Sequence, residues 1–312
     1  MKFLEIFKNA TENRLRSGWR ILGQQLLLVF ILMLLEDYAT APIKSSLSQN
    51  ALLMLDAITG ILAFGISIWL SGKWFDHRRF VDFGFHLSRF WWIQLGFGAA
   101  LGAFLMSLIF LAEWSLGYVY IIQVGFTVEP GMSLAFVLLV MFIHYSGVSF
   151  TEEILTRGYL LRNLLDGFSV LNRKMAIGFA VFVTSIIFAL PHAGNPNATL
   201  PSTLLLVVFG VMCAVGVIFT RELAIPLGLH LTWNFFQGHV FGFPVSGWAM
   251  RGGTILQIQQ SGPRWFTGGT FGPEAGVVGL LAMVLGILLI VLWGRANVQT
   301  KESYVKRNQF TA

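Results

Sequence analysis

Two adjacent glutamates and an arginine lie in a strongly apolar stretch of the chain, at Glu152, Glu153 and Arg157. An ionisable side chain at membrane depth costs a few kcal/mol, so such groups usually face a polar cavity and carry function. On a helix, Glu153 and Arg157 are four residues apart and can form an ion pair along one face. Glu152 points about 100° away from Glu153 around the helix. It has no obvious local partner, and it is therefore the first candidate for chemistry.

Two further polar motifs follow. Phe188 and His192 stand at the end of one apolar run, and His230 and Asn234 lie on one helix face inside another. A carboxylate beside a histidine can hold and deprotonate a water as a general base. A second histidine and an amide can donate hydrogen bonds to the oxyanion that forms when this water attacks a peptide carbonyl. Together these residue types suffice for amide hydrolysis.

The same side chains allow a metal-dependent alternative. Glu152, His192 and His230 could ligate zinc and leave a fourth position open for water. The sequence leaves both mechanisms open. Polar groups on three separate spans need one another to be satisfied within lipid, so we expect these three residues and Asn234 to meet in one cavity.

The remaining polar residues have structural interpretations. For Glu153 and Arg157 a structural ion pair is the better interpretation than direct chemistry. We expect His144 to be hydrogen-bonded to a neighbouring helix and His239 to lie at the membrane interface. Cys213 is the only cysteine and cannot form an intrachain disulfide, so it is expected to be a small core residue.

The composition is that of a polytopic membrane protein. Of 312 residues, 55% are hydrophobic and 12% are charged, and the mean hydropathy is +0.71. A soluble domain of this length needs far less apolar sequence. We expect an all-α fold, a polytopic membrane helical bundle with about eight transmembrane helices. The pI is near 9.7, but the basic residues are spread over several loops, so no nucleic-acid partner is expected.

Eight apolar runs have about the length that a bilayer requires. They cover roughly 21–35, 51–70, 91–111, 132–153, 175–190, 203–219, 223–240 and 276–293. Straight helices would place His192 near the outer face and His230 in the inner half of the membrane. We therefore expect helices to tilt or break, for example at Pro191 and Pro226, and the fourth helix to continue past Glu153 to about residue 165.

The chain is expected to form one membrane domain. We divide it into an N-terminal segment at 1–20, a transmembrane domain at 21–293 and a tail at 294–312. Within the domain, 132–240 is the core that carries the motifs, and 241–275 is a glycine-rich outer loop, either flexible or a lid over the site. The segments that flank the spans fall alternately on the two sides of the membrane. The set on one side, which includes both termini, holds 18 of the 21 Lys and Arg residues. The positive-inside rule therefore places both termini in the cytoplasm.

Taken in order, three motifs resemble those of a known family. Glu-Glu-x-x-x-Arg at 152–157, Phe-x-x-x-His at 188–192 and His-x-x-x-Asn at 230–234 resemble the CPBP family, the CAAX prenyl protease 2 or Abi type of intramembrane protease. The resemblance covers about residues 75–290. It implies a multi-pass membrane enzyme that hydrolyses a peptide or protein substrate in the lipid bilayer. The short basic loops resemble bacterial members, which implies a plasma-membrane location and makes a prenylated substrate less expected.

The resemblance also implies a role for each residue. Glu152 and His192 would activate the water, and His230 with Asn234 would stabilise the oxyanion. The supporting residues would be Glu153, Arg157 and Phe188. The family has been described both as metal-dependent, in which case zinc is the expected cofactor, and as glutamate-dependent without metal. The resemblance leaves this choice open.

Two other function classes compete with a protease. A proton-coupled transporter could use the glutamates and histidines as a relay, but we find no matching halves of the kind that transporters often show. A non-catalytic bacteriocin-immunity protein could keep the fold, but all three motifs are intact. Other intramembrane proteases fit less well, because the chain lacks the His-Glu-x-x-His of site-2 zinc proteases and the Gly-x-Ser-Gly of rhomboids.

Overall fold

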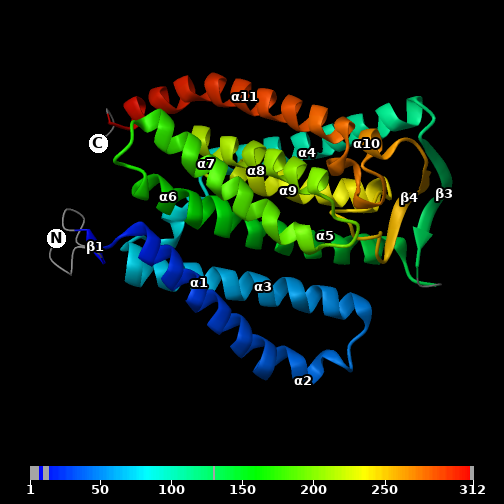
Figure 1. Ribbon diagram of the computed structural model, residues 1–312, viewed down its shortest axis with the longest axis horizontal. Helices are drawn as coiled ribbons and strands as arrows, with labels where there is room; N and C mark the ends of the chain where they lie inside the picture. The colour runs from blue at the N-terminus through cyan, green and yellow to red at the C-terminus, as the bar shows by residue number, and fades with distance from the viewer. Residues whose placement is uncertain (1–6, 10–13, 129–130, 310–312) are drawn as a thin grey trace.

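The structure, a computed structural model, describes residues 7–9, 14–128 and 131–309 as a helical bundle with two short antiparallel strand pairs (Figure 1). Its α-helices are α1 Ser17–Leu34, α2 Ala41–Lys44, α3 Gln49–Ser71, α4 Arg89–Ser115, α5 Leu134–Glu153, α6 Leu161–Gly167, α7 Arg173–Ala189, α8 Leu200–Thr220, α9 Ala224–Phe235, α10 Arg264–Thr267 and α11 Val277–Gln309. The strands are β1 Lys8–Asn9, β2 Arg14–Leu15, β3 Val119–Thr127 and β4 Gly253–Gln260. The expected tail at 294–312 continues α11 as a helix through Gln309.

Seven helical segments in the described part of the chain are long and apolar enough to cross a membrane. They are Ser17–Lys44, Gln49–Asp76, Arg89–Ser115, Leu134–Gly167, Arg173–Gly194, Leu200–Thr220 and Val277–Asn297. The predicted all-α membrane bundle is confirmed, and the protein is a multi-pass membrane protein.

The eighth predicted span, at 223–240, differs from the other seven. It forms the 12-residue helix α9 and a π-helical turn at Phe236–Val240, which together are shorter than the seven membrane-length segments. This piece still carries the chain back across the bundle, so both termini lie at one end and β3 and β4 at the other (Figure 1). The sequence predicted that residues 223–240 cross the bundle, but it did not predict that they do so with so short a helix.

Close glycine packing allows α9 to sit inside the bundle. A Cβ atom on Gly98 would lie 2.2 Å from the carbonyl oxygen of Ile225, and one on Gly102 would lie 2.4 Å from that of Leu229. The two glycines of α4 are four residues apart, which is the spacing by which membrane helices bring their backbones into contact. The helix that carries His230 and Asn234 is thereby fixed against α4.

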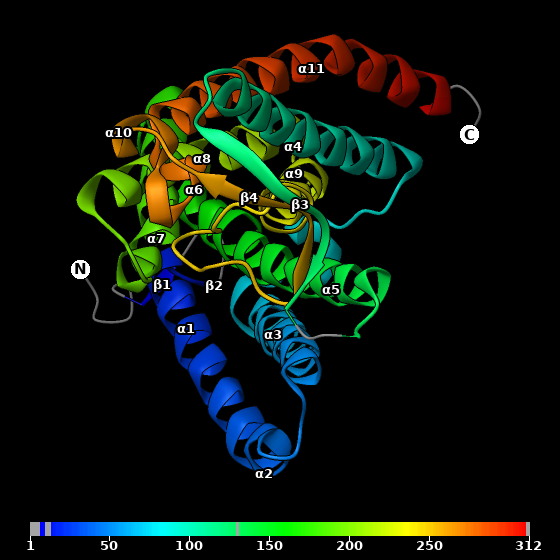
Figure 2. The ribbon, with the colours of Figure 1, turned by 90° about the vertical axis from the view of Figure 1, so that its right-hand side faces the viewer.

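The glycine-rich segment at 241–275 is more ordered than an irregular loop. Its strand β4 pairs with β3 in antiparallel register, from Val119 opposite Gln260 to Thr127 opposite Gly253. The strands cross the end of the bundle, as Figure 2 shows. The sequence interpretation did not include β3, so it missed this pairing.

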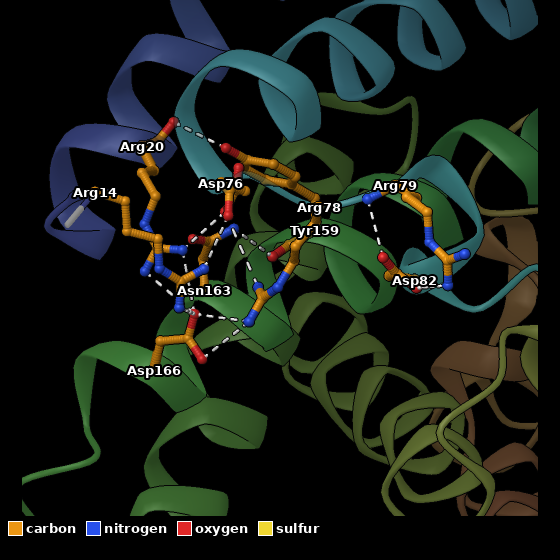
Figure 3. A network of polar contacts seen from close by, with 9 residues as sticks. All are labelled: Arg14, Arg20, Asp76, Arg78, Arg79, Asp82, Tyr159, Asn163 and Asp166. Carbon is orange, nitrogen blue, oxygen red and sulfur yellow. Dashed lines mark hydrogen bonds and ion pairs between the residues drawn. The ribbon is translucent and has the colours of Figure 1, made fainter. Parts of the chain in front are cut away.

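At the opposite end, a partly buried ionic cluster joins β2, α1, α6 and the end of the Gln49–Asp76 segment (Figure 3). Arg20 of α1 contacts Asp76 at 2.9 Å, with 1% and 0% of the two side chains exposed. Asp166 of α6 accepts hydrogen bonds from Arg14, Arg20 and Arg78. Since α6 continues the helix that carries Glu152 and Glu153, the cluster fixes that helix to α1 and to the end of the Gln49–Asp76 segment.

Candidate active site

The fourth predicted helix continues beyond the glutamates, as the sequence predicted. α5 ends at Glu153, a π-helical turn covers Ile154–Leu160, and α6 runs on to Gly167, so that Leu134–Gly167 is one continuous segment. π-helical turns inside helices are rare and occur often at functional sites. Here the turn begins directly after the two carboxylates.

This continuation brings the motifs of Glu152 and His192 to the same depth along the bundle. Glu152 lies fifteen residues before the end of α6, a rise of about 22 Å. α7 then runs back over 17 residues, a rise of about 25 Å. The helix ends at Ala189, and Pro191 stands in a tight 3₁₀ turn that contains His192. The break predicted at Pro191 is therefore present, and His192 comes to the depth of Glu152. Pro226, by contrast, lies in the first turn of α9, where it breaks nothing.

All four candidate catalytic residues line one cavity of about 480 Å³. α5 contributes Glu152, the turn after α7 contributes His192, and α9 contributes His230 and Asn234. The remaining walls come from α5, α7, α8, α9, the turn after α7 and the 241–275 segment: Met141, His144, Tyr145, Val148, Phe188, Pro191, Asn195, Leu206, Phe209, Trp233, Val245, Ser246, Trp248, Ala249, Arg251 and Glu274. The expectation that the polar groups meet in one cavity is met.

Glu153 is the centre of a buried charged group. One of its oxygens, Oε1, lies 2.9 Å from Nη1 of Arg157 and 2.9 Å from Nδ1 of His230. The Glu153 and Arg157 side chains are both 0% exposed. Arg157 also donates to the carbonyl oxygen of Gly210 on α8 at 3.1 Å. The predicted ion pair between residues four apart is present, and it extends to the histidine of α9.

Aromatic rings enclose the charged group. The Arg157 guanidinium lies 4.3 Å from the ring centre of Phe188. The His230 ring packs edge-on against Phe188 and Phe209, with centroids 5.9 and 5.2 Å away. These contacts leave His230 little freedom to turn, and they give Phe188 a structural role beside His192.

Glu152 has a different environment from Glu153. Its side chain is 31% exposed, and its Oε2 lies 3.9 Å from Nε2 of His230. That oxygen has no hydrogen-bond partner among the described residues. Among the described residues, Glu153 forms no hydrogen bond with Glu152, so its support reaches Glu152 through His230 and the shared helix. Oε2 itself is buried from solvent, so Glu152 opens to the cavity through the rest of its side chain, which is 31% exposed. A carboxylate that is partly exposed to a cavity is suited to bind a water.

His192 has one nitrogen engaged. Its Nδ1 lies 3.0 Å from the carbonyl oxygen of Phe188. A carbonyl can only accept, so Nδ1 carries the hydrogen and Nε2 of the neutral ring is free to accept one. The turn at Pro191 therefore fixes which nitrogen can act in the cavity.

The donor set suits zinc by residue type but not by arrangement. In the described part of the chain, no three His, Cys, Asp or Glu side chains are grouped closely enough to hold a metal ion. Glu152 Oε2 and His230 Nε2 lie 3.9 Å apart, but His192 does not complete a three-ligand metal site with them. The mechanism below therefore uses no metal.

The sequence interpretation missed most of the cavity wall that the 241–275 segment supplies. Glu274 is 2% exposed and accepts hydrogen bonds from the amide and hydroxyl of Ser246 and from the Gln237 side chain. Burial raises the pKa of Glu274 to about 7. The nearby Asn195, three residues after His192, donates to the carbonyl oxygen of Ser246 at 2.8 Å. These bonds fasten the segment over the cavity.

Two other histidines have structural contacts. His144 lines the cavity and lies 3.4 Å from the carbonyl oxygen of Leu53 on α3, which agrees with the expected bond to a neighbouring helix. His239 was expected at the membrane interface, and this was wrong. It is 1% exposed and lies 2.6 Å from the carbonyl oxygen of Gly253 in β4, because the π-helical turn directs it into the protein. Cys213 is buried, as expected.

These features define a membrane-embedded cavity with a carboxylate, two histidines and an amide around one space. Residues 132–236 match the family model of the type II CAAX prenyl endopeptidases, Rce1-like. This segment runs from α5 to α9 and contains all the motif residues. The central third of the chain is therefore similar to this family of membrane endopeptidases. No curated protein and no solved structure matches the chain.

Proposed function

We propose that this protein is an intramembrane endopeptidase that hydrolyses a peptide bond of a membrane-associated or lipid-anchored substrate with a water activated by Glu152. The observation that carries the proposal is the difference in burial and bonding between the two glutamates. Glu153 is fully buried and bonded to Arg157 and His230, whereas Glu152 faces the cavity with one oxygen unpartnered. The family match supports the same class of reaction.

In the proposed reaction, a water lies between Glu152 and Nε2 of His192. Glu152 removes a proton as the water oxygen attacks the carbonyl carbon of the substrate. A C–O bond forms, and the carbonyl electrons move to the oxygen. When the intermediate collapses, the C–N bond breaks and Glu152 returns the proton to the leaving amine. His192 orients the water through the nitrogen that its turn leaves free.

The oxyanion is stabilised from α9. The Asn234 amide donates one hydrogen bond, and Nε2 of His230 donates the other. Because Nδ1 of His230 donates to Glu153, a second hydrogen on Nε2 makes the ring an imidazolium. Glu153 and Arg157 thus act as positioning residues for His230.

The orientation in the membrane follows from the basic residues. The end of the bundle that holds both termini also holds the basic set of segments, so we place it in the cytoplasm of a bacterial plasma membrane. The cavity is lined at its other end by the 241–275 segment. A substrate would then enter from the side of β3 and β4. This favours a peptide or protein with an extracytoplasmic or membrane-embedded cleavage site.

The test is cleavage of a library of membrane-anchored reporter peptides by the detergent-purified protein. Glu152→Gln is expected to reduce the cleavage rate at least about 100-fold, the range for loss of a general base. Glu113→Gln is the matched control, because Glu113 is a buried membrane-helix carboxylate bonded to Gln260 at 2.7 Å and lies outside the cavity. Cleavage by Glu152→Gln at the wild-type rate would refute the assignment.

The same preparation answers the question of metal. Cleavage that persists with a chelator, in protein without stoichiometric metal, supports the mechanism above. Stoichiometric zinc together with chelator-sensitive cleavage would instead make Glu152, His192 and His230 ligands. The cavity side chains would then have to move closer together than they are in this structure.

A further inference from the structure

We propose that a second cavity, at the end of the bundle where the termini lie, binds the headgroup and part of an acyl chain of an anionic phospholipid. This cavity has a volume of about 500 Å³ and lies between α6, α7 and α8. It is lined by Leu161, Arg162, Leu165, Ser169, Leu171, Arg173, Ala176, Ile177, Val217, Ile218 and Arg221. It shares no lining residue with the catalytic cavity.

Its lining combines two chemistries. Three arginines come from three separate segments, namely Arg162 from α6, Arg173 from the start of α7 and Arg221 from the end of α8. No acidic residue lines the cavity, and apart from Ser169 the other side chains are aliphatic. Arginine is well suited to phosphate, because its planar group can donate two parallel hydrogen bonds.

The positive charge of this cavity is not neutralised by the protein. Within the described residues, the guanidinium groups of Arg173 and Arg221 form no ion pair or hydrogen bond. Arg162 donates from Nη2 to the neutral carbonyl oxygen of Arg221 at 2.7 Å, and its Nε is buried without a partner. The nearby acids are engaged elsewhere. Asp166 binds the arginines of the ionic cluster, and Glu222 lies 2.9 Å from His86. A bound anion would supply the negative charge that these arginines lack.

The apolar walls identify the anion as part of a lipid. A free phosphate would contact the arginines but leave the aliphatic side chains uncovered. A phospholipid places its phosphate on the arginines and its chain on the walls formed by Ile177, Val217 and Ile218. Basic pockets between membrane helices on the cytoplasmic side have this composition when they hold anionic headgroups. A lipid here would also join α6, which continues the Glu152 helix, to α7, which carries Phe188.

The experiment is native mass spectrometry of the full-length protein with added phosphatidylglycerol or phosphatidylcholine. The test variant carries Arg162→Gln, Arg173→Gln and Arg221→Gln. The control variant carries Lys73→Gln, Arg79→Gln and Arg89→Gln, which removes the same charge from exposed residues outside the cavity. We expect the wild type and the control to retain phosphatidylglycerol over phosphatidylcholine, and the test variant to retain at least about tenfold less.

Three outcomes would overturn the proposal. Equal retention of the two lipids would remove the role of charge, and equal loss in the control variant would show a general surface effect. Inorganic phosphate that displaces the lipid at a similar concentration would make this a site for free phosphate. If the triple variant does not fold, the single variant Arg173→Gln, at an exposed position, gives the same comparison against Arg89→Gln.

Discussion

The buried position of Glu153 gives the sharpest prediction about this protein. Glu153→Gln keeps the shape of the side chain but removes its charge. Arg157 then remains as a buried cation without its anion, since both side chains are 0% exposed and the arginine's other hydrogen-bond partners among the described residues, Thr156 and Gly210, are neutral. Breaking one partner out of a buried pair typically destabilises by 3–5 kcal/mol. The amide can still accept one hydrogen bond, so we expect a loss of about 3 kcal/mol in the free energy of unfolding.

A double-mutant cycle separates the charge effect from the loss of a contact. Arg157→Gln alone should destabilise by a similar amount, because it leaves the Glu153 carboxylate buried beside His230 without its arginine cation. The double variant removes both charges. We expect its loss in the free energy of unfolding to be smaller than the sum of the two single losses by about 1–3 kcal/mol. Unfolding in detergent, followed by circular dichroism, measures all four proteins under identical conditions.

Activity in the same proteins tests the assigned roles. Glu152→Gln should lose cleavage while keeping nearly wild-type stability, because its Oε2 has no hydrogen-bond partner. Glu153→Gln should lose stability as well as activity. If Glu153→Gln is as stable as the wild type and yet inactive, Glu153 takes part in the chemistry directly, and the positioning argument fails.

Three further predictions concern the surrounding structure. Gly102→Leu should abolish cleavage and lower stability by at least about 2 kcal/mol, because any Cβ there meets the carbonyl oxygen of Leu229 at 2.4 Å; wild-type activity in this variant would show that α9 need not lie against α4. Asp76→Asn should destabilise by about 2 kcal/mol, because it removes the fully buried one of the two carboxylates that Arg20 contacts and leaves Asp166; unfolding in detergent measures this, and an unchanged unfolding curve would contradict it. The free energy of unfolding should fall as pH rises from about 4.5 to about 7, because burial raises the pKa of Glu274 in the folded protein above that of the unfolded chain; pH-dependent unfolding of Glu274→Gln should lack this part of the slope.

The site could be predicted in outline because its residues obey local rules. The pair Glu153 and Arg157 follows from a spacing of four on a helix, and it is present at 2.9 Å. The continuation of the helix past Glu153 follows from the need to bring motifs of different depth together, and it is also present. Both inferences needed only the geometry of one helix and the high energy of isolated polar groups in lipid.

What the sequence did not reveal depends on contacts between distant segments. His230 binds Glu153 rather than only facing the cavity, and 77 residues separate them. β3 and β4 pair across more than a hundred residues, and their apolar sequences gave no sign of a partner. Gly247 adopts a φ of +88°, and a Cβ there would lie 1.9 Å from the carbonyl oxygen of Pro196. This close approach holds the loop over the cavity, and composition alone shows only that the segment is rich in glycine.

The two possible chemistries place opposite demands on His230. As a zinc ligand, it must offer a lone pair from Nε2 and therefore be neutral, with the Nδ1 hydrogen donated to Glu153. As an oxyanion donor, it must carry hydrogens on both nitrogens. Glu153 accepts from Nδ1 in either case, but Arg157 shares the same Oε1 atom and compensates part of its charge. Glu152 is the second carboxylate beside this ring, and its Oε2 lies 3.9 Å from Nε2. In the mechanism that we propose, Glu152 is therefore both the base for the water and a carboxylate neighbour of the oxyanion donor His230.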